Sequence, residues 1–154
     1  MIAGEYTRGG HERVWMVGKN STAAIILKGS AVSWDYATLK DGSFILPTTA
    51  TINMFAGILW ENAGTSGNED DVARILAYGY HNGAYLAGTT VTPGARLVPV
   101  NGTSYMTLGV THADSTVEAP DEANVYAIAA TTGCLKASST VGNTYAVFVR
   151  ALGK

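Results

Sequence analysis

Turn-forming residues divide this sequence at short and regular intervals. Asp41-Gly42, Asn82-Gly83, Thr92-Pro93-Gly94 and Asn101-Gly102 each combine glycine with residues that favour tight turns. The segments between them are short and rich in β-branched and aromatic residues, and several alternate apolar and polar side chains. Turn signals spaced by roughly 8–12 residues are typical of β-sandwiches and β-barrels. The sequence therefore predicts a mainly β, single-domain antiparallel β-sandwich or β-barrel with at most one short helix.

The apolar segments between these turns are the predicted strands. Strands are expected at residues 22–27, 31–36, 44–46, 54–60, 96–100, 104–108 and 144–152, and residues 125–130 fit a strand or one short helix. Gly57 interrupts an apolar run and predicts a bulge or a close approach of two backbones. Pro99 predicts an edge strand, because proline cannot donate a hydrogen bond to a ladder.

Residues 72–80 fit two structures. Asp70-Asp71 precede apolar positions spaced as in a helix that these carboxylates would cap. Gly79 and the hairpin signal Asn82-Gly83 favour instead a strand that turns back into a second strand at residues 84–86. We favour two strands joined by a hairpin.

The first 20 residues are interpreted as an extended N-terminal arm (1–20) in front of a single β-domain (21–154). Residues 6–13 are polar and contain a Gly-Gly pair, so neither a helix nor a buried strand is expected there. Val14-Trp15 is either the first core strand or part of an arm that docks elsewhere, and both interpretations stay open.

Charged residues are scarce, at 14% of the chain with a net charge of -2, against about 25% in a typical domain. This composition excludes a disordered chain and a coiled coil, and the missing basic excess argues against a nucleic-acid partner. No apolar run approaches the roughly 20 residues of a membrane span, and no signal peptide is visible. We therefore expect no membrane association and synthesis in a reducing cytoplasm, where the single Cys134 forms no internal disulfide.

The titratable residues form no recognised catalytic or metal-binding motif. His11, His81 and His112 lack the spacing of paired metal ligands. No nucleophile elbow, P-loop or dinucleotide fingerprint is present. Glu69-Asp70-Asp71 lie in a Gly-rich loop that could bind calcium, but the EF-hand pattern is absent and an acidic loop tip is usually only solvated. We expect a non-enzymatic protein with no catalytic residue, cofactor or metal.

The order of several segments carries a resemblance to a known family. The segments are Lys-Gly-Ser-Ala-Val (28–32), Phe-Ala-Gly-Ile-Leu (55–59), Gly-Tyr (79–80), Thr-Pro-Gly-Ala-Arg-Leu (92–97) and a strand near the C-terminus (145–150). Their arrangement, over about residues 20–150, resembles the head decoration, or cement, proteins of tailed bacteriophages. The resemblance implies a virion protein, assembled in the host cytoplasm, that binds the outer capsid surface. It also implies a homo-trimer that clamps adjacent subunits of the major capsid protein.

In such a protein the N-terminal arm is the natural clamp. We expect Tyr6, Arg8, Arg13 and Trp15 to contact the capsid, because aromatic and arginine side chains dominate interface energetics. Each weak contact would be reinforced by the other protomers of a symmetric trimer.

Two other functions compete with this one. A carbohydrate- or receptor-binding β-module of a phage tail or fibre would use Tyr78, Tyr80 and Trp60 as an aromatic platform. Aromatic residues are also ordinary cross-strand partners in a sheet, so the platform is not specific evidence. The third possibility is a small β-fold enzyme that uses a loop carboxylate such as Asp70.

Deletion of residues 1–13 tests the arm. The truncated protein should fold, because the predicted β-domain is intact, and should no longer bind capsid particles. Circular dichroism and co-sedimentation with particles measure the two properties. Full binding by the truncated protein would refute the clamp.

Overall fold

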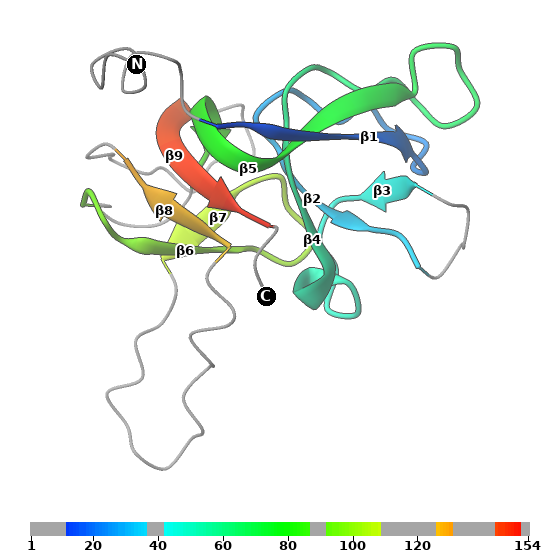
Figure 1. Ribbon diagram of the computed structural model, residues 1–154. Coiled ribbons are helices and arrows are strands. Elements are labelled where there is room, and N and C mark those ends of the chain that lie inside the picture. The colour runs from blue at the N-terminus through cyan, green and yellow to red at the C-terminus, as the bar shows by residue number, and fades with distance from the viewer. Residues whose placement is uncertain (1–11, 37–41, 87–91, 109–125, 131–143, 152–154) are drawn as a thin grey trace, which may run out of the picture.

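The computed structural model describes residues 12–36, 42–86, 92–108, 126–130 and 144–151. Nine strands and one 3-10 helix form the regular structure of this part of the chain (Figure 1). They are β1 (Val14–Asn20), β2 (Ala31–Trp34), β3 (Ser43–Ile45), η1 (Ile52–Met54), β4 (Phe55–Leu59), β5 (Val72–Tyr85), β6 (Arg96–Pro99), β7 (Met106–Leu108), β8 (Ala127–Ala129) and β9 (Thr144–Arg150). The predicted fold class, mainly β with at most one short helix, is confirmed. No helix in the described ranges has the length and apolar character needed to cross a membrane.

Strands β1 to β5 close into a five-stranded barrel. Their order is β1-β3-β2-β4-β5, and pairing of β5 with β1 completes the ring. The pairs are antiparallel except β1–β3, which runs parallel over Lys19↔Ser43 and Asn20↔Phe44. The interior of the barrel is filled by Ile26, Val32, Phe44, Ala56, Leu59, Ala63, Ala73 and Ile75.

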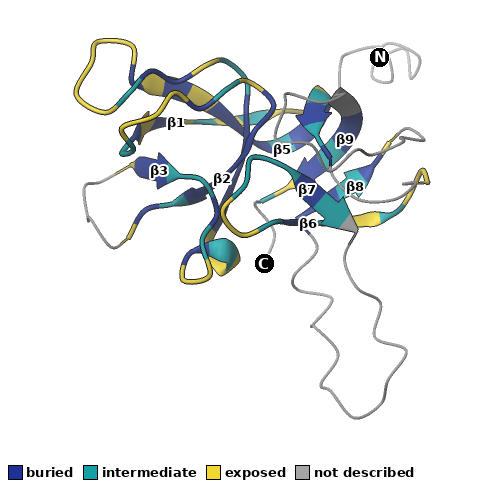
Figure 2. Cartoon of the chain, turned by 180° about the vertical axis from the view of Figure 1, so that it is seen from behind, coloured by how far each residue is buried: buried dark blue, intermediate teal, exposed yellow. Residues whose placement is uncertain are grey.

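The second half of β5 continues into a further sheet, in the order β5-β9-β8-β6-β7. A parallel bridge between Leu86 and Met106 brings β7 back to the end of β5. This sheet encloses a second core, which Ile58 and Leu76 join from the barrel strands. Figure 2 shows the buried residues running through the middle of the molecule, between loops that are exposed.

The middle strands are buried on both faces because they lie between the two cores. In β4, Ile58 belongs to the second core and Leu59 to the barrel core. In β5, Ile75 faces the barrel and Leu76 faces the second core. A segment buried on both faces is apolar without alternation, as at residues 75–77, whereas Val72 and Arg74 earlier in β5 are exposed. This change along the strand explains the ambiguous pattern of residues 72–80.

The structure confirms a strand at residues 72–80 but not the predicted hairpin. β5 runs unbroken to Tyr85, and its register with β9 shifts between His81 and Ala84. Asn82-Gly83 therefore forms a bulge rather than a turn. The His81 ring explains the difference, since its Nδ1 accepts a hydrogen bond from the Gly83 N–H (3.0 Å) and its Nε2 lies 3.2 Å from the Leu59 carbonyl oxygen.

Two other strand predictions are wrong in part. Residues 22–27 contain only an isolated bridge at Ile26, because the Asn20 side chain accepts hydrogen bonds from the N–H and Oγ1 of Thr22 and bends the chain there. β6 is not an edge strand, since it lies between β8 and β7. Pro99 is tolerated because the paired residues of β8 face Arg96 and Leu97 and end before it.

The predicted arm overlaps the barrel. β1 pairs with β5 from Val14 to Lys19, so Val14-Trp15 belongs to a strand of its own chain's sheet, one of the two alternatives left open by the sequence. Figure 1 shows β1 running alongside the first part of β5. Residues 1–11, which include Tyr6 and Arg8, lie outside the described residues.

Gly57 makes the close approach that the sequence predicts. Its φ is 141°, and a Cβ atom at this position would lie 2.2 Å from the Leu76 carbonyl oxygen of β5. The register of β2 on β4 shifts at the same level, between Val32 and Ser33. Only glycine allows β4 to pack this closely against β5.

Gly57→Ala should lower the free energy of unfolding by about 3 kcal/mol, because steric overlap adds to backbone strain. Gly67→Ala is the matched control, since Gly67 also has a positive φ of 90° but no atom within 4 Å of the added Cβ. The control should lose only about 1 kcal/mol. Urea unfolding measures both, and equal losses would contradict the close packing at Gly57.

Candidate functional site

Two tryptophans, one on β1 and one directly after β4, meet on the outside of the barrel beside β1. Trp15 projects from β1 and remains 36% exposed, while Trp60 follows directly after β4. Their ring centroids are 4.7 Å apart with an interplanar angle of 78°, which is an edge-to-face contact. Trp60 also contacts the His81 ring edge-to-face, with the centroids 5.0 Å apart. The buried histidine thus supports the tryptophan pair.

Three cations lie over these indole rings. The Arg13 guanidinium and the Lys28 ammonium group are 5.2 Å and 5.4 Å from the centroid of Trp60. The Arg74 guanidinium lies 6.0 Å from the centroid of Trp15. A cation within about 6 Å of an indole face is attracted by the negative face of the ring. We call Arg13, Trp15, Lys28, Trp60 and Arg74 the Trp60 surface.

The register of β1 on β5 places Trp15 and Arg74 on one side of the sheet and extends the Trp60 surface with apolar side chains. Along β1, alternate residues face outward, and Val17 is 63% exposed. Val17 lies opposite Arg74 of β5, and Lys19 lies opposite Val72, which is 52% exposed. Two large aliphatic side chains therefore continue the Trp60 surface along the outer face of β1 and β5.

Arg74 is held in place by Glu61. Its Nε and Nη2 atoms each lie 3.1 Å from a carboxylate oxygen of Glu61, and its backbone N–H also donates to Oε1 at 2.9 Å. These hydrogen bonds lower the pKa of the Glu61 carboxyl and raise the pKa of the Arg74 guanidinium. The charge of Arg74 is therefore already balanced within the protein.

Arg13 and Lys28 differ from Arg74, because neither forms an ion pair with a described residue. Both side chains are exposed, and the exposed Glu12 beside Arg13 makes no ion pair with it. The Trp60 surface thus presents two positive charges over one aromatic ring that no carboxylate of the described residues pairs with.

His81 is fully buried under this surface and stays neutral at pH 7. Its pKa is lowered to about 4, mainly by burial and also by the positive charges of Lys28 and Arg13, whereas the hydrogen bond to Leu59 acts to raise the pKa. Nδ1 accepts from Gly83, so Nε2 carries the proton and donates it to the Leu59 carbonyl. The sequence offered no sign of this role, which depends on the bulge in β5.

The protein should become less stable as the pH is lowered, because of His81. The pKa is about 4 in the folded state and 6.5 as the ordinary value, so the unfolded chain takes up the proton first. The contribution of His81 to the free energy of unfolding is therefore fully present above about pH 6.5, and it decreases by about 3 kcal/mol as the pH falls towards 4. Urea unfolding of the protein and of His81→Gln across this range isolates the effect. A stability difference between the two proteins that stays constant with pH would contradict it.

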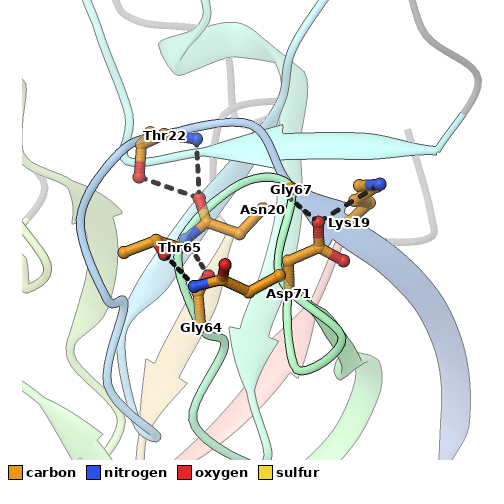
Figure 3. Close-up of polar contacts among 8 residues, drawn as sticks. Lys19, Asn20, Thr22, Gly64, Thr65, Gly67 and Asp71 are labelled. Carbon is orange, nitrogen blue, oxygen red and sulfur yellow. Dashed lines mark hydrogen bonds and ion pairs between the residues drawn. The ribbon is translucent and has the colours of Figure 1, made fainter.

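The acidic loop at residues 64–71 has a structural role in the barrel (Figure 3). The buried Asn20 amide donates to the carbonyl oxygens of Ala24 and Gly64, each at 2.8 Å. Asp71, the carboxylate at the end of the loop, accepts a hydrogen bond from the Gly67 N–H at 2.8 Å and pairs with Lys19 at 3.2 Å. These contacts fasten the loop to β1. Across the described ranges, no three His, Cys, Asp or Glu side chains gather in a way that could hold a metal ion.

The structure brings some predicted site residues together and separates others. Arg13 and Trp15, expected to contact the capsid, both belong to the Trp60 surface. The alternative function expected Trp60 and Tyr78 to form one aromatic platform. In the structure, Trp60 contacts Trp15 of β1, whereas the Tyr78 ring packs edge-to-face on Phe148 of β9 with centroids 5.1 Å apart. The sequence missed Lys28 and Arg74 as members of the surface, because only tertiary structure places them beside the tryptophans: Arg74 through the register of β5 on β1, and Lys28 through a turn in which its N–H donates to the Asn62 side chain.

Comparison with known proteins shows a shared fold. No family model matches this chain, and no curated protein matches it. Among solved structures, it is similar to the N base of the head fiber gp8.5 of bacteriophage phi29, with a TM-score of 0.54. The two are 10% identical, and the similarity covers 90% of this chain and 94% of that chain.

Proposed function

We propose that this protein is a non-enzymatic structural component of a bacteriophage virion. It binds the outer surface of the head and stabilises contacts between subunits of the major capsid protein. The observation that carries the proposal is the similarity of its fold to a head fiber base over nearly the whole of both chains. The arrangement of segments that resembles phage decoration proteins supports the same location.

The Trp60 surface is the contact site in this proposal. Tryptophan and arginine are the residues most enriched among those that dominate binding energy at interfaces. Trp15, Val17 and Val72 expose apolar area that a partner would remove from water. A homo-trimer would present three copies of the surface, so that each contact increases the effective concentration of the next.

A second candidate is the base module of a head fibre, the role named for the protein with the similar structure. In this form of the proposal, the chain occupies fewer positions than a protein that covers the whole shell. The carbohydrate-binding alternative is less favoured. Sugar rings stack on open aromatic faces, whereas Arg13 and Lys28 already lie over Trp60.

The copy number on particles separates the two virion functions. Particles purified from a lysate on a density gradient are analysed by gel for the molar ratio of this chain to the major capsid protein. A ratio near one supports a decoration protein that covers the shell. A few copies per particle support a fibre base, and absence from particles would overturn the proposal.

Trp15→Ala should weaken binding to heads that lack this chain by at least about 30-fold, because it removes a central aromatic contact. Met54→Ala is the matched control, since Met54 is 40% exposed, close to the 36% of Trp15, but belongs to η1 away from β1 (Figure 1). Co-sedimentation measures binding, and circular dichroism confirms folding. Equal binding by both variants would exclude the Trp60 surface as the contact.

A further inference from the structure

We propose that the Trp60 surface recognises an acidic segment of a partner protein, and that Arg13 and Lys28 bind its carboxylates. The inference rests on the proposed function only for the identity of the partner, which is then the exterior of the capsid. The partner segment would place its carboxylates on the two cations and its apolar side chains against Trp15, Val17 and Val72.

The two cations of the proposed site lie beside the same ring. Arg13 and Lys28 both lie within 5.4 Å of the centre of the same indole ring. Their positive charges also act together on the buried His81, whose pKa both of them lower. A carboxylate that binds beside this ring is therefore attracted by both positive charges.

The neighbouring cations differ from these two in their ion pairs. Arg74 is balanced by Glu61, and Lys19 is balanced by the buried Asp71. Arg13 and Lys28 have no such partner among the described residues. Guanidinium groups bind carboxylates through paired hydrogen bonds, so Arg13 is suited to orient an incoming Asp or Glu.

The small number of cations on the Trp60 surface favours a protein partner over a nucleic acid. The whole chain has a net charge of -2, and nucleic-acid binding surfaces need many cations to replace counterions along the phosphate backbone. The Trp60 surface offers two cations without an ion pair in the described part of the chain, and a neighbouring strip of exposed Val17 and Val72. Mixed apolar and charged surfaces of this kind fit a protein partner with a few acidic residues.

The test uses three probes with the full chain. They are a fluorescein-labelled glutamate peptide of about ten residues, duplex DNA of about 20 base pairs, and phage heads that lack this chain. Fluorescence anisotropy measures binding to the first two, and co-sedimentation measures binding to heads. The variants are Arg13→Glu and Lys28→Glu. The matched control is Arg96→Glu, which changes the net charge equally at an exposed position on β6.

Each surface variant should weaken binding to the peptide and to heads by about tenfold, and Arg96→Glu by less than about twofold. Binding should also decrease as the salt concentration rises. Arg13→Glu and Lys28→Glu should both raise the pKa of His81 in an NMR titration, because a positive charge near the ring is replaced by a negative one. This last measurement checks that the two side chains sit where the structure places them.

The outcomes separate the two proposals. Head binding that is insensitive to both variants and to salt would overturn the acidic partner and leave the proposed function intact. Peptide binding that depends on Arg13 and Lys28, without binding to heads, would support the acidic partner and overturn the capsid as its source. Tighter binding to the duplex than to the peptide would overturn the inference in favour of nucleic acid.

Discussion

The burial of β4 and β5 between two hydrophobic cores is the constraint on which the rest of the structure depends. Where both cores meet these strands, successive residues such as Ile58 and Leu59 fill opposite cores, so neither face tolerates a charged side chain there. Arg74 lies on the exposed first part of β5, outside this stretch. The same constraint requires glycine at position 57, where the two backbones approach. Because both cores share these strands, the barrel and the second sheet cannot shift relative to each other without unpacking both.

The Trp60 surface depends on β4 and β5, the two strands that both cores share. Trp60 follows the last residue of β4, and its position outside the barrel is supported by the ring of His81. His81 is placed there by the bulge in β5, where its two nitrogens bond Gly83 and Leu59. A neutral, buried imidazole thus links the internal packing to an external surface that carries three cations.

The similarity to a head fiber base at 10% identity shows how far one scaffold can be retained while its side chains change. The similarity shows the fold, and the binding chemistry of this chain belongs to its own residues. In this chain, charge is scarce at 14%, which makes the pairing of Arg13 and Lys28 over one ring more informative than in a highly charged protein.

The sequence by itself determined the β class, most of the strands and the turns at Gly42, Gly94 and Gly102, all of which have positive φ. These features depend on the preferences of a few consecutive residues. Tertiary structure decided that Asn82-Gly83 forms a bulge, because His81 competes for its backbone groups. It also decided the membership of the Trp60 surface, because strand register, which no local pattern encodes, determines which distant side chains meet.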